Sequence, residues 1–235
     1  MNQTLTSTDR VGEIVANHPQ AARIFERHGI DYCCSGGRTL EQACQRKGLD
    51  PSTVTAEVVD LVTGHPETGL RWADRSMTDV ADHIERFHHT YLKTELPRLS
   101  ALIEKVNTAH GDRHPELFEV ARVFEAFRAE MTDHMRKEEE VLFPAARKLD
   151  AARSIDGFEW LVRGPLTCLV HEHEEAGQAL TRMRQLTGGY TPPANACATY
   201  RVMLDSLARL EADTHQHVHK ENNILFEKMQ RRLAC

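Results

Sequence analysis

A histidine followed four residues later by a glutamate, both with metal-binding side chains, occurs at His134 and Glu138 and again at His217 and Glu221. A spacing of four residues places both side chains of a pair on one face of an α-helix, about one turn apart and roughly 6 Å along its axis. Each helix could therefore offer an imidazole to one metal ion and a carboxylate that reaches toward a second ion. The chemistry that these pairs predict is metal binding between helices.

Both pairs fall where apolar core residues are expected. Steps of three and four residues follow one buried stripe along a helix, and one stripe runs through Leu117, Val120, Phe124, Phe127, Met131, His134, Glu138 and Val141. A second runs through Met203, Leu207, Leu210, Thr214, His217, Glu221 and Ile224. Two further stripes carry one histidine each, namely Val80, Ile84, His88, Tyr91 and Leu166, Leu169, His173, Ala176, Leu180.

Six ligand-type side chains would thus be buried together. Without partners, four imidazoles and two carboxylates would each cost several kcal/mol to bury. A pair of metal ions would satisfy them, with the histidines as terminal ligands and Glu138 and Glu221 able to bridge. Nitrogen and oxygen donors without thiolate favour iron, with manganese or zinc as alternatives. A mononuclear site and a polar bundle core are the remaining interpretations.

Neighbouring residues of the same types are expected to lie outside the site. Positions two residues from His217 are about 200° round the helix from it, so imidazoles there point outward. Four histidines are excluded by such counting: His89, His171, His215 and His219. Four glutamates are expected in solvent: Glu139, Glu140, Glu172 and Glu174. Of these, Glu172 is a candidate hydrogen-bond partner for a ligating imidazole.

The elements that must position these residues are helices. Short segments come first: residues 19–28 stop at Gly29, residues 40–47 have a capping box of Thr39 and Gln42, and a third begins at Pro51. Long amphipathic segments follow at about residues 76–108, 115–149, 165–186 and 194–233. Within them, Pro97 and Pro144 are expected to kink or break the helix.

This pattern predicts an all-α protein in two parts. Residues 1–63 form a small helical domain, residues 64–75 have the Gly/Pro-rich polar composition of a linker, and residues 76–235 form an antiparallel four-helix bundle. Such bundles commonly hold metal sites built from facing side chains.

A second group with possible chemistry is Cys33-Cys34, within "DYCCSGGRTLEQA". The pair precedes a capped helix, whose N-terminal partial charge and free N–H groups can stabilise a thiolate. Redox activity, iron transfer or soft-metal binding would follow, and two ordinary loop cysteines is the alternative. The remaining cysteines show no pairing pattern and are interpreted as free thiols: Cys44, Cys168, Cys197 and Cys235.

Composition excludes several other classes of protein. The net charge is −6, with Lys and Arg interspersed among acids, which argues against nucleic-acid binding. No apolar run approaches the length of a membrane span, and the first residues have no signal-peptide core, so a cytoplasmic location is expected. Hydrophobic residues make up 40% of the 235 positions, enough for a sizeable core.

The order of motifs "DYCC…GG", "RFHH", "HMRKEEEVLFP", "HEHEEAG" and "HVHKENNILF" resembles the RIC (repair of iron centres) family, the YtfE/ScdA/DnrN-like di-iron proteins of bacteria. The resemblance spans about Val11 to Met229. It implies an N-terminal cysteine (ScdA-type) domain joined to a haemerythrin-like bundle with two non-haem iron ions, bridged by oxo and carboxylate groups. It places the ligands on His88, His134, Glu138, His173, His217 and Glu221, and matches the cysteine motif to Cys33 and Cys34. One departure is "ILFE", where Glu227 replaces the proline of "LFP".

The resemblance also implies a function. The family is associated with recovery of iron–sulfur proteins from nitrosative and oxidative stress, with nitric oxide chemistry and with iron donation. An oxygen-carrying haemerythrin is similar but takes two histidines from its third helix, whereas the positions four residues either side of His173 are Leu169 and Gly177. The missing imidazole predicts a more open, reactive centre.

Three hypotheses follow for the activity. The first is a repair protein whose partners are damaged iron–sulfur proteins, with nitric oxide or dioxygen as small ligands, and whether it turns over nitric oxide as an enzyme is left open. The second is a module that buffers or senses these gases without turnover. The third is an iron-storage or structural bundle, in which Cys33 and Cys34 would have no role. A homodimer is compatible with each.

Overall fold

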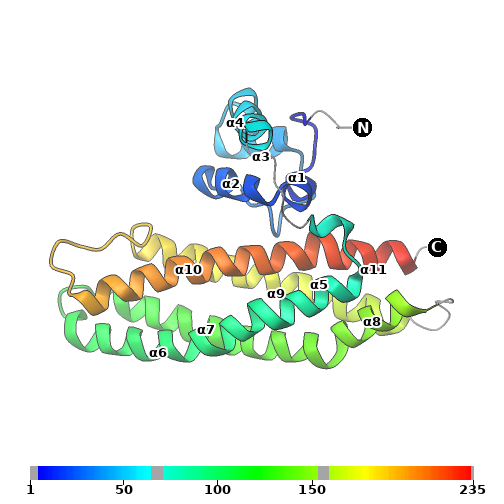
Figure 1. Ribbon diagram of the computed structural model, residues 1–235. Helices are drawn as coiled ribbons and strands as arrows, with labels where there is room; N and C mark the ends of the chain where they lie inside the picture. Colours follow the sequence, from blue (N-terminus) through cyan, green and yellow to red (C-terminus); the bar gives the residue numbers. More distant parts are fainter. Residues whose placement is uncertain (1–4, 65–70, 153–158, 234–235) are drawn as a thin grey trace.

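Helices account for nearly all of the computed structural model, which describes residues 5–64, 71–152 and 159–233 (Figure 1). No strand occurs among these residues, apart from one isolated bridge between Arg10 and Thr39. The all-α fold class predicted from the sequence is confirmed.

The N-terminal part consists of α1 (Val11–Asn17), a 3₁₀ turn (Pro19–Ala21), α2 (Ala22–His28), α3 (Leu40–Lys47) and α4 (Pro51–Gly64). The predicted capping box is present, because the Thr39 side chain accepts from the Gln42 N–H and the Gln42 side chain accepts from the Thr39 N–H. Helices α2 and α3 end at Gly29 and Gly48 with φ of 64° and 67°, a conformation that glycine adopts without strain. Helix α1 was not predicted from the sequence.

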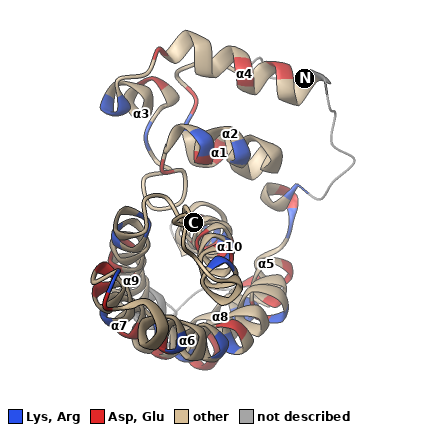
Figure 2. Ribbon diagram, turned by 90° about the vertical axis from the view of Figure 1, so that its left-hand side faces the viewer, with Lys and Arg blue, Asp and Glu red and all other residues tan. Residues whose placement is uncertain are grey.

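Four long helical rods form the second part (Figures 1 and 2). They are α5 (Met77–His83) with α6 (Thr90–His110), α7 (Glu116–Lys137) with α8 (Phe143–Ala151), α9 (Glu159–Leu186), and α10 (Ala198–Lys220) with α11 (Phe226–Leu233). Residues 65–70, half of the predicted linker 64–75, lie outside the described residues, and Trp72–Asp74 form a 3₁₀ turn. The division at residues 63 and 76 stays a prediction.

Three of the rods contain a π-helical segment: Ile84–His89, Glu138–Leu142 and Glu221–Leu225. A π-helix bonds residue i to i+5 instead of i+4, so it moves the buried stripe on by one residue. The effect is visible after Glu138, where the predicted core residue Val141 is 44% exposed and Leu142 is 1% exposed. The prediction of a buried Val141 is therefore wrong.

Pro144 and Glu227 each follow a π-helical segment, whereas Pro97 lies inside a regular helix. Pro144 is the second residue of α8, directly after the π-helical Glu138–Leu142, and α6 continues through Pro97. Glu227 is likewise the second residue of α11, directly after the π-helical Glu221–Leu225. The passage from π-helix to α-helix is therefore the same with Glu227 as with Pro144.

The bundle core is divided into two apolar clusters. One contains Leu92 and Leu96 of α6, with Met131 of α7 and Leu210 of α10, and the other contains Val80, Leu142, Leu169 and Ile224, each with further buried neighbours. Along each rod, the predicted ligands lie between the residues of the first cluster and those of the second. A polar layer is thus enclosed by apolar side chains on both sides.

The N-terminal helices lie over the side of the bundle formed by α10 (Figures 1 and 2). Their core includes Val218 of α10. The Asn223 side chain reaches across, and its Nδ2 donates to the carbonyl oxygens of Tyr32 and Cys33 at 3.2 and 2.9 Å. Contact is close because Gly12 and Gly36 present no Cβ to Asn223.

Candidate metal centre

Each His–Glu pair lies where a regular helix becomes π-helical. His134 is in the last turn of α7 and Glu138 begins the next segment, and His217 and Glu221 repeat this arrangement at the end of α10. All four side chains are buried, as is His173 in α9. π-helical turns occur often at functional sites, where they redirect side chains out of a regular helical pattern.

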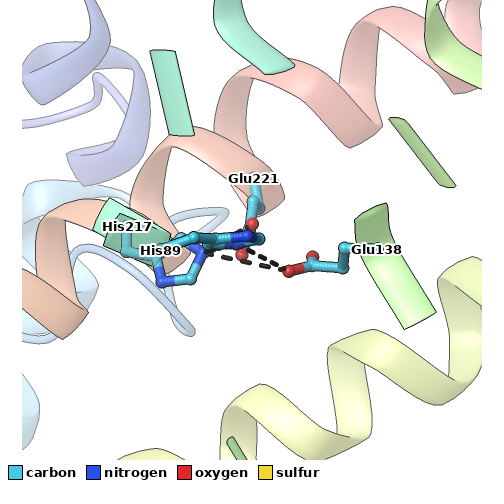
Figure 3. Close-up of side chains that lie close together, drawn as sticks. All are labelled: His89, Glu138, His217 and Glu221. Carbon is cyan, nitrogen blue, oxygen red and sulfur yellow. Dashed lines mark hydrogen bonds and ion pairs between the residues drawn. The ribbon is translucent and has the colours of Figure 1, made fainter. Parts of the chain in front are cut away.

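Two groups of ligand atoms share the same two carboxylates. One contains His89, Glu138, His217 and Glu221, and the other contains His134, Glu138, His173 and Glu221, with all ligand atoms of each group within 4.8 Å of one another. Figure 3 shows the first group, in which the imidazoles of His89 and His217 converge on the two glutamates. Glu138 Oε2 lies 3.3 Å from His89 Nε2 and 3.4 Å from His134 Nε2.

The imidazoles meet in pairs, nitrogen to nitrogen. His89 Nε2 lies 3.3 Å from His217 Nε2, and His134 Nε2 lies 3.0 Å from His173 Nε2. Two nitrogens bound to one ion at ~2.1 Å are separated by about 2.9–3.4 Å for angles between square and tetrahedral. Both pairs fall in this interval, so each has the spacing of two ligands of one ion.

Several buried oxygens and nitrogens of the group have no hydrogen-bond partner among the described residues. They are Glu138 Oε1, Glu138 Oε2, Glu221 Oε2 and His217 Nδ1. Unsatisfied carboxylate oxygens in a fully buried site are costly unless a cation meets them. The carboxylates therefore fit a bound metal, which would supply the partner that their oxygens lack, whereas His217 faces the cluster with Nε2 and not with Nδ1.

The charge states of the group agree with this fit. Burial lowers the pKa of His217 to about 3 and also lowers the pKa values of His89 and His134, which keeps these imidazoles neutral as metal ligands must be. Burial, with the adjacent Glu221, raises the pKa of Glu138 well above its usual value. A cation between the two glutamates would favour the ionised form of Glu138 and so oppose that rise.

The structure brings together five of the six predicted ligands and replaces the sixth, His88, by His89. An α-helix would place the residue four after Ile84 on the core stripe, but Ile84–His89 are π-helical, so the fifth residue takes that place. His88 instead has Nδ1 2.9 Å from Asp213 Oδ1 and Nε2 3.2 Å from Lys220 Nζ. The expectation that His89 points away from the site is wrong.

Three of the clustered imidazoles are oriented by a partner at Nδ1. His89 Nδ1 lies 2.7 Å from Glu139 Oε1, and His134 Nδ1 lies 2.8 Å from Glu172 Oε2. His173 Nδ1 lies 2.9 Å from Asn222 Oδ1. Each partner leaves Nε2 directed at the carboxylates.

The predicted role of Glu172 as such a partner is confirmed. The expectation that Glu139 is solvated is wrong, because it is half-buried between His89 and Lys93. Sequence reasoning missed Asn222, although its position next to Glu221 was the available signal.

The other three histidines excluded from the site lie either on the surface or under the N-terminal helices. His171 is exposed as expected. His219 is buried, contrary to expectation, because the N-terminal helices cover it: its ring centroid lies 5.5 Å from that of Tyr32. Burial lowers the pKa of His219 to about 3. His215 is partly buried beside the same tyrosine.

Cys33 and Cys34 lie close to this centre but outside it. The Cys34 Sγ is 3.5 Å from the backbone carbonyl oxygen of His173, and a Cβ added to Gly177 would lie 3.7 Å from the same sulfur. The cysteine loop therefore faces the position where the second imidazole of the third helix is missing. Asn222 connects the two regions, because its Nδ2 donates to the Cys33 carbonyl oxygen at 3.3 Å.

The predicted stabilisation of a thiolate at Cys33 by the following helix is wrong. The hydrogen-bonded Cys34 thiol, together with burial, raises the pKa of Cys33 well above its ordinary value. The backbone N–H groups of Cys33 and Cys34 and the Cys33 thiol all donate to Asp31 Oδ1. Among the described cysteines none forms a disulfide, in agreement with the interpretation as thiols.

A buried His/Glu cluster inside a four-rod helical bundle, preceded by a small cysteine-bearing domain, defines a haemerythrin-type cation-binding protein. Two family models match the chain accordingly: ScdA_N, described as a domain of unknown function, over residues 7–62, and the hemerythrin HHE cation binding domain over residues 80–229.

Curated relatives match nearly the whole chain. It is 34% identical to the iron-sulfur cluster repair protein ScdA of Staphylococcus haemolyticus, over 95% of this chain and 99% of the relative. It is 33% identical to a probable iron-sulfur cluster repair protein of Haemophilus influenzae, over 94% and 96%. Identity to YtfE of an Enterobacter species is 32%, over 93% and 94%. The chain belongs to the ScdA/YtfE family, as its motifs indicated.

No helix among the described residues is long and apolar enough to cross a membrane.

Proposed function

We propose that this protein repairs iron–sulfur clusters damaged by nitrosative or oxidative stress, through nitric oxide chemistry, iron donation or both, at a centre of two iron ions. The observation that carries the proposal is the sharing of Glu138 and Glu221 by two groups, each with two converging imidazoles. The names of the relatives, iron-sulfur cluster repair proteins, supply the target.

In this proposal His89 and His217 would hold one ion and His134 and His173 the other, with both glutamates within reach of the two. The position of Glu138 supports bridging, since neither of its oxygens has a hydrogen-bond partner among the described residues and its Oε2 lies between His89 Nε2 and His134 Nε2, at 3.3 and 3.4 Å. An oxo bridge would complete the pair. Iron bound there would supply redox chemistry and open positions for nitric oxide or dioxygen.

The protein's own residues prepare this site. Glu139, Glu172 and Asn222 hold three imidazoles in place, and apolar side chains on both sides exclude water. The third rod offers one imidazole, that of His173, because position 177 is a glycine, and we propose that this keeps ligand positions open. We further propose that Cys33 and Cys34 assist redox or iron transfer, since the Cys34 sulfur touches the backbone of His173.

The test is recovery of a [4Fe–4S] enzyme inactivated by nitric oxide, mixed with iron-loaded protein. Metal analysis should give about two irons per chain with oxo-bridged absorption, and the wild type should restore activity. Glu138→Ala/Glu221→Ala should lose both the iron and the repair. A stoichiometric single zinc, or undiminished repair without iron, would refute the proposal. Unchanged repair by Cys33→Ser/Cys34→Ser would refute only the assistance by the cysteines.

Complete burial of the ligand set favours one alternative, a module that binds nitric oxide or dioxygen without turnover. This alternative would be supported if the iron-loaded protein bound nitric oxide but neither consumed it nor restored the damaged enzyme. In both cases a cytoplasmic location and a homodimer stay predictions.

A further inference from the structure

A second set of metal-ligand side chains lies outside the bundle, in the loop between α2 and α3. The ligand atoms of Asp31, Cys33 and Cys34 lie within 4.8 Å of one another. The set shares no residue with the His/Glu centre, and thiolate with carboxylate is a different donor chemistry from imidazole with carboxylate.

The spacing of the two sulfurs fits one tetrahedral ion. Cys33 Sγ and Cys34 Sγ are 3.8 Å apart. Two thiolates bound to a tetrahedral ion at ~2.3 Å are separated by about 3.8 Å. A disulfide would need the sulfurs about 2.05 Å apart, so the loop holds the thiols at the separation of a chelate.

The third donor is fixed before any ion arrives. Asp31 Oδ1 accepts the backbone N–H groups of Cys33 and Cys34 at 3.1 and 2.9 Å and lies 3.2 Å from Cys33 Sγ. A carboxylate oxygen and a thiolate on one tetrahedral ion lie about 3.5 Å apart, so a shift of a few tenths of an ångström completes the geometry. Burial raises the pKa of Asp31, but hydrogen bonds from Cys33, Ser35 and Cys34 lower it more, so the group is a carboxylate at neutral pH.

The loop opens onto a cavity of about 930 Å³ between the two parts of the chain, lined by Asp31, Cys33, Cys34 and Gly177 among others. Two thiolates and a carboxylate around a divalent ion carry a net charge of −1. The cavity lining is mixed in charge, with the basic residues Arg27, Lys47, Arg182 and Arg184 and the acidic residues Glu26, Glu174 and Glu211 beside Asp31. The cavity also leaves room for a fourth ligand from outside the chain.

We propose that Asp31, Cys33 and Cys34 bind one thiophilic divalent cation of the Zn²⁺ or Fe²⁺ type, with the fourth coordination position open to the cavity. The two thiol protons leave to solvent as the sulfurs bind, and no electron is transferred. An ion held by three ligands beside a cavity exchanges more readily than one enclosed by helices. Such a site would give the cysteines a part in the proposed function. Metal binding at the loop does not depend on that function, and only the use of the bound ion in iron transfer rests on it.

Co²⁺ is a suitable probe, because tetrahedral thiolate coordination gives it charge-transfer and intense visible absorption. Reduced full-length protein, already loaded with iron, is titrated with Co²⁺ without oxygen. We expect one cobalt per chain with thiolate charge-transfer bands and no loss of iron, and displacement of that cobalt by Zn²⁺. Cys33→Ser/Cys34→Ser should abolish the bands.

Two further variants test the assignment. Asp31→Asn keeps an oxygen that accepts the loop N–H groups but loses the charge, so cobalt affinity should fall at least about tenfold with the thiolate bands retained. Cys168→Ser/Cys197→Ser removes two exposed thiols elsewhere and should leave the titration unchanged.

Absent thiolate bands in the wild type, or bands that persist in Cys33→Ser/Cys34→Ser, would overturn the proposal. So would cobalt that only replaces iron one for one. These results are distinguishable from failure of the proposed function, because iron content and recovery of the damaged enzyme are measured separately.

Discussion

The His/Glu centre and the cysteine loop place metal-binding side chains in opposite kinds of surroundings. Each residue of the proposed centre comes from a helical segment, and each of its two groups draws on three of the four rods. The Asp31, Cys33 and Cys34 donors lie within one loop, beside a cavity. Ligands spread over packed helices can be released only by moving the core, whereas a loop can release an ion by itself. The difference predicts that metal leaves the centre more slowly than it leaves the loop.

The two regions meet at one π-helical segment. Glu221 begins it and faces the bundle centre, and Asn222 and Asn223 follow and hold the loop through the carbonyl oxygens of Tyr32 and Cys33. Asn222 also contacts His173. Three successive residues thus position a carboxylate, an imidazole and the cysteine loop.

The largest expected effect is that of removing metal from the centre. A ligand that binds only the folded state, at a free concentration of about a thousand times its Kd, stabilises that state by roughly 4 kcal/mol. For a chain of this size that corresponds to a rise in Tm of ~8–16 °C. Iron-loaded protein should therefore unfold that much above iron-free protein in calorimetry. One equivalent of Zn²⁺ added to iron-loaded protein should shift Tm by less than ~4 °C, because the loop site lies outside the core. Equal shifts of Tm on metal binding at the centre and at the loop would contradict the proposed difference between the two sites.

The next effect separates two adjacent histidines. His89→Gln should leave about one iron per chain, because the ion held with His217 loses an imidazole. His88→Gln is the matched control and should keep about two, since His88 contacts Asp213 and Lys220 and belongs to neither group. Iron determination by a colorimetric chelator decides between them, and the reverse result would restore His88 as the ligand.

This pair also shows how far the sequence could predict the site. The spacing of three and four predicted five residues that the structure brings together, because regular α-helix precedes each of them: His134, Glu138, His173, His217 and Glu221. It failed at His88, where Ile84–His89 are π-helical. A π-helical segment depends on packing between rods and leaves no periodic signal in one sequence.

The contact between the N-terminal helices and the bundle could not be predicted for a different reason. Counting round α10 placed His219 away from His217 but could not show that Tyr32 covers it. Contacts between segments about 190 residues apart, such as that of Asn223 with Cys33, depend on tertiary packing. Helices and caps were predictable because their signals are local.

A smaller effect is expected from loosening the contact between the regions. A Cβ at Gly36 would meet the Asn223 side chain and the Tyr32 carbonyl oxygen, the latter at 2.7 Å, whereas one at Gly37 would meet nothing within 4 Å. Gly36→Ala should thus weaken the docking of the N-terminal helices on the bundle by ~1–3 kcal/mol of free energy. The docking equilibrium constant would fall about 5- to 150-fold. Faster maleimide labelling of Cys34, relative to Cys197, would report it.

Gly37→Ala is the control and should label as the wild type does. Both variants should retain their iron, because the ligands of the centre all belong to the bundle. Loss of iron in Gly36→Ala alone would show that docking of the N-terminal helices is needed for metal retention.

The smallest effect is expected at Gly177, in the middle of α9. An added Cβ would lie 3.7 Å from Cys34 Sγ, an ordinary van der Waals contact. Gly177→Ala should therefore raise stability by ~0.5–1 kcal/mol through helix propensity, or about 1–4 °C in Tm. Labelling of Cys34 should change less than about twofold, with iron content unchanged. Because the side-chain direction at this position leads to the cysteine loop, a large loss of iron in this variant would mean that the two regions are coupled through α9 as well as through Asn222.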